Sequence, residues 1–171
     1  NDYQLNFDVE SSSDDAYLLD YGYADKDRLD SAIELLRIQD QSLFQTRLTY
    51  YQTLRDDEAN ASLPPIIADA TYFWSTEPSF GGKLKLETTV DLAYRYSDVD
   101  GDAGRDVFRT GLLGSWEENW VLPYGMVGEF EVGGRSDLYF VADDNSFEDQ
   151  DLRFAPYSEV SLRWPLLQTN Q

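Results

Sequence analysis

Alternation of apolar and polar residues is the feature that most constrains how this chain can fold. It is clearest over residues 83–96. The even positions there carry Leu84, Leu86, Thr88, Val90, Leu92, Tyr94 and Tyr96. The odd positions carry Lys83, Lys85, Glu87, Thr89, Asp91, Ala93 and Arg95. Successive side chains of a β-strand point to opposite faces, so this pattern predicts a strand with one apolar and one polar face.

The same period of two recurs along almost the whole chain, and no segment keeps the helical period of 3.6. Apart from residues 83–96, the alternating segments are 3–9, 27–38, 42–54, 66–74, 105–117, 124–141 and 152–164. Most are longer than the strands of ordinary globular sheets. We therefore predict an all-β fold, an antiparallel up-and-down meander of about eight long strands.

The connections between these segments alternate in length. The longer ones are residues 11–26, 55–63, 97–104 and 142–150, and the shorter ones are 39–41, 75–81 and 118–123. In a meander, alternate connections lie at the same end of the sheet, so all the longer, strongly acidic loops share one end. Short turns at one end and long polar loops at the other are typical of outer-membrane barrels, so we expect the meander to be part of, or to close into, such a barrel.

The aromatic residues fit this arrangement. The four tryptophans, Trp74, Trp116, Trp120 and Trp164, all fall at the short-turn end. At the other end lie Tyr94, Tyr96, Tyr139 and Phe140. Aromatic girdles at both interfaces mark membrane barrels. Two alternatives remain: a soluble β-sandwich or lipocalin-like binding module, in which these rings are ordinary core residues, and a porin or receptor barrel.

Charge and composition exclude several functional classes. With 13 Lys+Arg against 33 Asp+Glu, the net charge is −20, which disfavours nucleic acid as a partner. The absence of His and Cys excludes His-based triads, thiolate chemistry, disulfides and the usual zinc sites. The hydrophobic content of 42% is too high for a disordered acidic tail, so the chain is folded.

One loop has a composition that suits a hard cation. Asp98, Asp100 and Asp102 are spaced two apart and are followed by Gly104 and Arg105. Calcium prefers such oxygen ligands, but Arg109 stands where an EF-hand needs a glutamate, and Asp and Gly also dominate plain hairpin loops. We interpret the loop as a solvated turn and assign no metal site. Weak bridging by divalent cations between such loops and lipid phosphates is a hypothesis that calorimetry with calcium can test.

Carboxylates are abundant, but none of them indicates catalysis. An acid–base pair of the glycosidase type can be drawn from Glu87, Asp91, Glu129 or Glu131, yet no spacing singles out one pair. We expect these charges to solvate the polar face and Arg95, Arg105 and Arg109 to pair with nearby acids. We predict bulges or close backbone approach at Gly125, Gly128, Gly133 and Gly134. No catalytic or cofactor-binding residue is assigned, and an enzyme is not expected.

Three ordered patterns resemble the barrel of the LPS-assembly family LptD, also called organic solvent tolerance protein. The first is SDDAYLLDYG at 13–22, followed by Asp27-Arg28-Leu29, which resembles the family's S-D-x-x-Y-h-x-D loop. The second is Leu63-Pro64-Pro65 leading into a strand with Tyr72. The third is Arg153-Phe154-Ala155-Pro156, an R-x-x-P strand opening, with Trp164-Pro165-Leu166 after it. Together they match essentially the whole chain to a middle portion of that barrel.

The resemblance implies a non-catalytic role at the outer membrane. Members of the family insert lipopolysaccharide (LPS) into the outer leaflet, receive it from periplasmic bridge proteins, and hold a small lipoprotein plug inside a very large barrel. The chain shows no periplasmic jellyroll, no first or last barrel strand, and none of the disulfide cysteines that some members of the family have. The family's lateral gate therefore maps onto no residue here.

The chain opens at Asn1 without a leader-like segment, and no apolar run approaches the length of a membrane helix. We expect residues 1–171 to be a single β-barrel segment, a fragment of a larger barrel domain. A segment of this kind exposes two strand edges, so we expect the isolated chain either to close into a smaller barrel or to self-associate through those edges.

Overall fold

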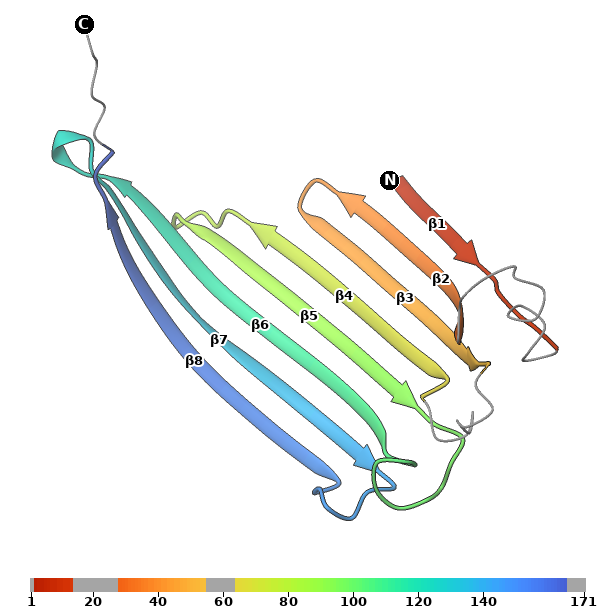
Figure 1. The fold of residues 1–171 in the computed structure, drawn as a ribbon. Coiled ribbons are helices and arrows are strands. Elements are labelled where there is room, and N and C mark those ends of the chain that lie inside the picture. Colours follow the sequence, from red (N-terminus) through yellow and green to blue (C-terminus); the bar gives the residue numbers. More distant parts are fainter. Residues whose placement is uncertain (1, 14–27, 55–63, 166–171) are drawn as a thin grey trace, which may run out of the picture.

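The computed structural model describes residues 2–13, 28–54 and 64–165, which form one antiparallel sheet (Figure 1). Its strands are β1 (Asp2–Asp8), β2 (Arg28–Gln39), β3 (Ser42–Thr53), β4 (Ile66–Thr76), β5 (Lys83–Tyr94), β6 (Asp106–Val121), β7 (Val127–Ala142) and β8 (Gln150–Arg163). A single 3-10 turn, η1 (Pro123–Gly125), lies between β6 and β7. Within these described ranges, no helix is long and apolar enough to cross a membrane.

The strand order in the sheet is the strand order in the chain, β1 to β8, and every neighbouring pair is antiparallel. The predicted up-and-down meander of eight long strands is thereby confirmed. The sheet is open: in the described ranges, β1 and β8 are its two edges and no second sheet packs on it. The described residues therefore form neither the two-layer sandwich of the soluble alternative nor a closed small barrel, and an open curved sheet is consistent with part of a larger barrel.

The strand boundaries agree with the predicted segments except around the last short turn. We predicted that a strand ends at Glu117, but β6 continues to Val121, because Glu118 and Trp120 stay in register opposite Phe130 and Gly128. Two acids and an asparagine interrupt the apolar alternation there without interrupting the backbone pairing. The chain then reverses through η1, where Tyr124 and Gly125 have φ of 66° and 74°.

The predicted bulges among the glycines are wrong, whereas the predicted close approach is correct at Gly133. The register of β7 runs one to one along both neighbours, so Gly128, Gly133 and Gly134 sit in unbulged pairs. A Cβ atom at Gly133 would lie 2.7 Å from the Gly114 carbonyl oxygen and 2.7 Å from the Tyr157 ring. Gly125 lies in η1 instead of a strand.

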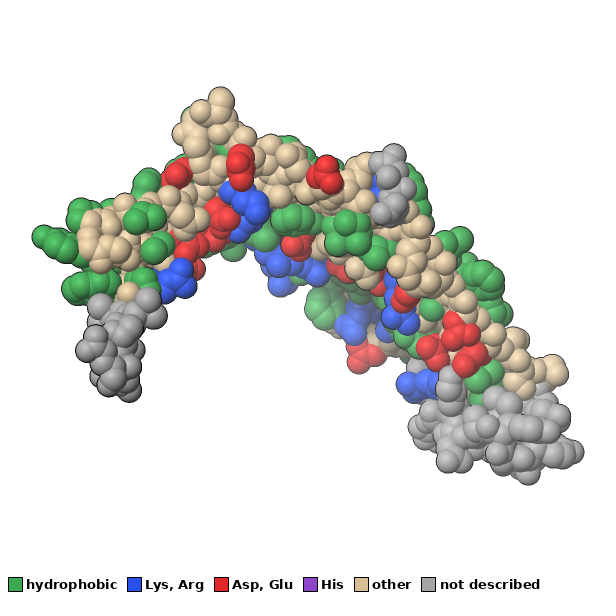
Figure 2. Space-filling view, turned by 90° about the horizontal axis from the view of Figure 1, so that it is seen from above, with side chains coloured by type: hydrophobic (Ala, Val, Ile, Leu, Met, Phe, Trp, Pro, Cys, Tyr) green, Lys and Arg blue, Asp and Glu red, His purple; other side chains and the backbone are tan. Residues whose placement is uncertain are grey.

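The sheet is curved, and its two faces differ in chemistry. Figure 2 shows it as an arch with most hydrophobic side chains on the convex side and most charged side chains gathered on the concave side. The alternation along β5 explains the division: Lys85, Glu87 and Asp91 belong to one face, and Leu84, Leu86 and Val90 to the other.

The convex face has almost no protein cover. In the part of the chain that the structure describes, the only buried large hydrophobic side chains are Leu29 and Leu54. Leu112 is 48% exposed although it lies in β6, which has strands on both sides. Ile33, Leu48 and Val132, also on interior strands, are exposed too. Apolar side chains on the convex face therefore lack the packing partner that a soluble domain would supply.

Aromatic residues mark both ends of the convex face. The indole N–H groups of Trp116 and Trp164 donate hydrogen bonds to the carbonyl oxygens of Gly81 and Tyr124, 3.1 Å each, at the short-turn end. At the long-loop end, the Phe108 and Phe140 ring centroids lie 5.9 Å apart, and those of Tyr94 and Tyr96 lie 5.8 Å apart. Tyr139 also lies at this end, as predicted, but on the concave face, where the guanidinium groups of Arg109 and Arg153 lie over its ring.

Candidate functional site: the charged concave face

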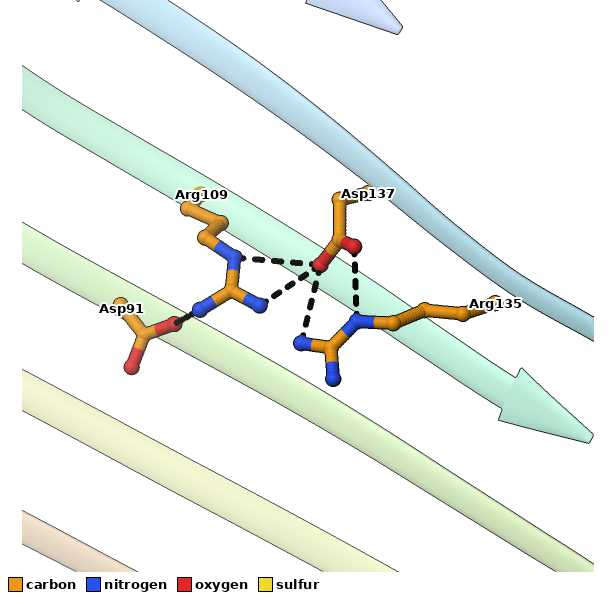
Figure 3. A network of polar contacts seen from close by, with 4 residues as sticks. All are labelled: Asp91, Arg109, Arg135 and Asp137. Carbon is orange, nitrogen blue, oxygen red and sulfur yellow. Dashed lines mark hydrogen bonds and ion pairs between the residues drawn. The ribbon is translucent and has the colours of Figure 1, made fainter. Parts of the chain in front are cut away.

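Four charged side chains form a continuous network on the concave face, toward its long-loop end (Figure 3). The Asp137 carboxylate accepts hydrogen bonds from Arg109 Nε and Nη2, at 3.1 and 2.7 Å, and from Arg135 Nε at 2.7 Å. Arg109 Nη1 reaches across to Asp91 Oδ2, at 3.2 Å. Two positive and two negative charges from β5, β6 and β7 are thus joined, and the network carries no net charge.

The strand register brings these residues together. Arg109 lies opposite Asp91 on β5, and Gly111 lies opposite Asp137 on β7, so Arg109 and Asp137 are diagonal neighbours on one face. Gly111 leaves the space that the network occupies. A Cβ atom there would lie 2.6 Å from Thr89 Oγ1 and 2.9 Å from Asp137 Oδ1. The absence of a side chain at this position lets the carboxylate lie over the backbone of β6.

A second cluster lies nearer the short-turn end of the same face. Lys85 on β5 forms an ion pair with Glu117 on β6. The Tyr157 hydroxyl on β8 donates a 2.7 Å hydrogen bond to Glu131 on β7. These contacts cross strand boundaries, as the Arg109 network does, and they tie β5 to β6 and β7 to β8. Farther along the sheet, Arg47 and Glu34 pair at 3.4 Å between β3 and β2.

The four carboxylates considered for acid–base chemistry all lie on the concave face but not in one place. Glu87 and Asp91 are on β5, Glu129 and Glu131 are on β7, and β6 separates the two pairs. Asp91 pairs with Arg109, Glu131 accepts from Tyr157, and Glu129 accepts from Ser161 at 3.5 Å. The arrangement separates these carboxylates into two groups, and only Asp91 among them forms an ion pair in the described contacts.

The long-loop end is organised by contacts between two acidic loops. Asp100 Oδ1 accepts the backbone N–H of Asn145 at 2.8 Å, and the Gly101 N–H donates to the Asp143 carbonyl at 2.9 Å. Arg105 pairs with both Asp102, at 2.7 Å, and Asp144, at 3.1 Å. Asp100, Gly101 and Arg105 therefore hold this loop against residues 142–150. No cluster of three metal-ligating side chains occurs among the described residues, so calcium bridging stays a hypothesis.

The predicted pairing of arginines with acids is confirmed for Arg105 and Arg109. Arg95 behaves differently: its guanidinium donates to the Arg105 carbonyl oxygen, and its backbone N–H donates to Asp106 Oδ1 at 2.7 Å. Sequence reasoning missed Asp137 and Arg135, the residues that complete the network. The available signal was their spacing of two on one strand, but their partners depend on the register with β6.

The residues behind the family resemblance are distributed as follows. Ser13 is described, but positions 14–22, Asp27, Leu63 and Leu166 lie outside the described residues. Tyr72 lies in β4 and the Arg153–Pro156 pattern lies in β8, as expected from the predicted strands. Trp164 and Pro165 follow the end of β8.

Comparison with known proteins gives one family. A search of curated proteins finds no match. The family model for LptD, described as LPS transport system D, matches residues 1–170, which is nearly the whole chain. The match agrees with the open all-β meander and with the ordered motifs. The chain therefore belongs to the LptD family, a family of LPS transport and assembly.

Proposed function

We propose that this chain is a non-catalytic wall segment of the outer-membrane translocon that inserts LPS into the outer leaflet. One observation carries the proposal: the convex face is apolar and no second layer of described protein packs on it, whereas the concave face carries charged side chains, several of which are joined in ion pairs. Lipid is the solvent that fits the first face, and a water-filled lumen fits the second.

The length of β6 that is apolar on the convex face, the apolar band, also supports the proposal. On β6, the convex face runs from Phe108 at the long-loop end to Trp116 at the short-turn end, with Leu112 halfway between them. That is about nine residues, near the length that a tilted strand needs to cross the hydrocarbon layer. Short turns face the periplasm in bacterial barrels, so the loops 97–105 and 142–150 would face the cell exterior.

The proposed partners follow from these two faces. The transported LPS is the ligand, and the family's lipoprotein plug would contact the concave face, because it sits in the lumen. Periplasmic LPS-bridge proteins would approach from the short-turn side. The ion pairs of the concave face, such as Lys85 with Glu117, supply alternating charges to which a polar partner can bind.

Adjacent positions on β6 provide the test. Leu112 belongs to the convex face and Leu113 to the concave face, and the chain has no native cysteine. We would label Leu112→Cys and Leu113→Cys with the same fluorophore in outer-membrane vesicles and add a lipid-bound nitroxide quencher. Quenching at position 112 alone is the expected result. Equal quenching at the two positions, or none at either, would contradict the proposal.

The two sheet edges form a separate part of the proposal. In the described ranges, β1 and β8 each pair on one side only, which leaves backbone donors and acceptors available for another strand. The isolated chain in detergent should therefore self-associate. Sedimentation velocity tests this, and a stable monomer at all protein concentrations would argue against edge pairing without affecting the quenching result.

A further inference from the structure

A cavity of about 670 Å³ opens on the concave face at the long-loop end. It is lined by the ends of β6, β7 and β8, by the last residue of the β5–β6 loop and by the loop between β7 and β8: Arg105, Val107, Tyr139, Val141, Phe147, Glu148, Asp151 and Arg153. Its volume lies within the range of small-molecule binding pockets. We propose that it binds an uncharged segment of an oligosaccharide.

Phe147 provides the first argument. The side chain is 53% exposed and lines the cavity, and the Arg105 guanidinium lies over its ring, 5.0 Å from the centroid. The loop holds this position, because the Phe147 N–H donates to the Asp144 carbonyl at 3.2 Å and Arg105 pairs with the Asp144 carboxylate. An exposed but fixed aromatic ring offers a flat apolar surface on which the C–H face of a sugar ring can stack.

The polar lining provides the second argument. Arg153 Nε donates to Asp151 Oδ2 at 2.7 Å, and Arg153 also lies over the Tyr139 ring. Guanidinium and carboxylate groups that lie side by side offer several donors and acceptors, which suit the vicinal hydroxyls of a sugar.

Charge selects the ligand class. Arg105 and Arg153 are balanced within the lining by Glu148 and Asp151, and the neighbouring Asp102 and Asp144 add negative charge beside Arg105. A strongly anionic ligand gains no net attraction from such a site, and an apolar ligand would displace water from the lining charges without forming hydrogen bonds to them. A hydroxyl-rich, uncharged saccharide satisfies both conditions.

This inference rests on the proposed function in one respect only, namely where the saccharide comes from. If the chain is a translocon wall, the cavity lies at the exterior mouth of the lumen, and the saccharide is a sugar portion of LPS. Saccharide binding itself depends on the cavity alone, whereas the lipid-quenching test depends on the sheet faces alone. Each result can therefore fail without the other.

Calorimetry on the full chain in detergent tests the inference with two probes, a dephosphorylated and delipidated LPS oligosaccharide and maltotriose. Phe147→Ala and Arg153→Gln should each weaken binding about tenfold. Phe80→Ala, an exposed ring at the short-turn end, and Arg163→Gln, on the same face of β8 but at its other end, should leave binding unchanged. Phe147→Leu keeps apolar bulk without the ring and should resemble Phe147→Ala.

The two probes distinguish the possible sources. Binding of the LPS oligosaccharide alone assigns the cavity to LPS, and binding of both probes with the same sensitivity to the variants assigns it to neutral glycans in general. Absence of binding for both probes overturns the inference. Binding that none of the cavity variants alters also overturns it. Retained β-sheet circular dichroism in each variant shows that a lost signal comes from the cavity.

Discussion

The convex and concave faces of this sheet are made by the same strands, yet their side chains interact with different surroundings. On the concave face, Asp137 and Arg109 find partners within the chain, at distances of 2.7–3.2 Å. On the convex face, Leu112 and Val132 remain 48% and 41% exposed. The comparison teaches that the protein itself determines the stability of the concave face, whereas the medium against the sheet determines that of the convex face.

A charge on each face should give the largest contrast. Leu112→Arg places a guanidinium halfway along the convex band and should destabilise the folded chain in lipid by about 2–4 kcal/mol, the range for arginine at a bilayer midplane. Leu113→Arg is the matched control, because it faces the concave side, between Glu87 and Arg135 in the register. Urea unfolding in lipid vesicles measures both. Equal losses would mean that the two faces meet the same medium.

Two glycines on β6 differ in the space that surrounds them: Gly111 is closely packed, and Gly114 is not. Gly111→Ala should destabilise by about 1–3 kcal/mol, because its new methyl group would collide with Thr89 Oγ1 and the pinned Asp137 carboxylate. Gly114→Ala points to the convex face and meets nothing within 4 Å. It should be neutral or slightly stabilising, since alanine restricts the unfolded chain. The comparison fails if the two variants unfold at the same denaturant concentration.

Removal of the central carboxylate should have a smaller effect. Asp137→Asn leaves Arg109, whose side chain is 26% exposed, with Asp91 as its remaining partner in the network. We expect a loss of about 1–2 kcal/mol, close to that of a hydrogen bond to a charged group. The loss should shrink in high salt, because screening weakens the native pair. Thermal unfolding at two salt concentrations measures this, and an unchanged midpoint would exclude a stabilising role for the network.

The smallest effect is expected at Asp151. Its partner Arg153 is 69% exposed in its side chain, so the pair is largely solvated. Asp151→Asn should leave the unfolding midpoint unchanged within error, in contrast to Asp137→Asn on the neighbouring strand. A loss as large as that of Asp137→Asn would show that exposure does not distinguish the two pairs.

The fold was largely predictable, because the alternation of apolar and polar side chains with a period of two residues is a local property of each strand. Residues 83–96 anticipate both β5 and the face of each of its side chains, and the loop lengths anticipate the meander. The end of β6 could not be predicted, since Glu118 and Asn119 keep their place through backbone pairing with β7, which the side-chain pattern does not record.

The concave site was predictable only in part. Arg109 was expected to pair with an acid, but the choice of Asp137 depends on the register between β6 and β7, in which Asp137 lies opposite Gly111. The cavity at the long-loop end was not predicted at all. Its shape depends on individual hydrogen bonds and ion pairs between two loops, such as the bond from the Asn145 N–H to Asp100. The pattern of apolar and polar residues does not predict such contacts.

The neighbour-only strand order has a consequence for how the sheet assembles. Each strand pairs with the one just before it in the chain, so no strand needs a partner that is distant in the sequence. The longest connection between paired strands is residues 9–27. Loop-closure entropy stays small at every step, a property of fast-forming topologies. The sheet can grow hairpin by hairpin from one edge, and each newly added strand becomes the template for the next.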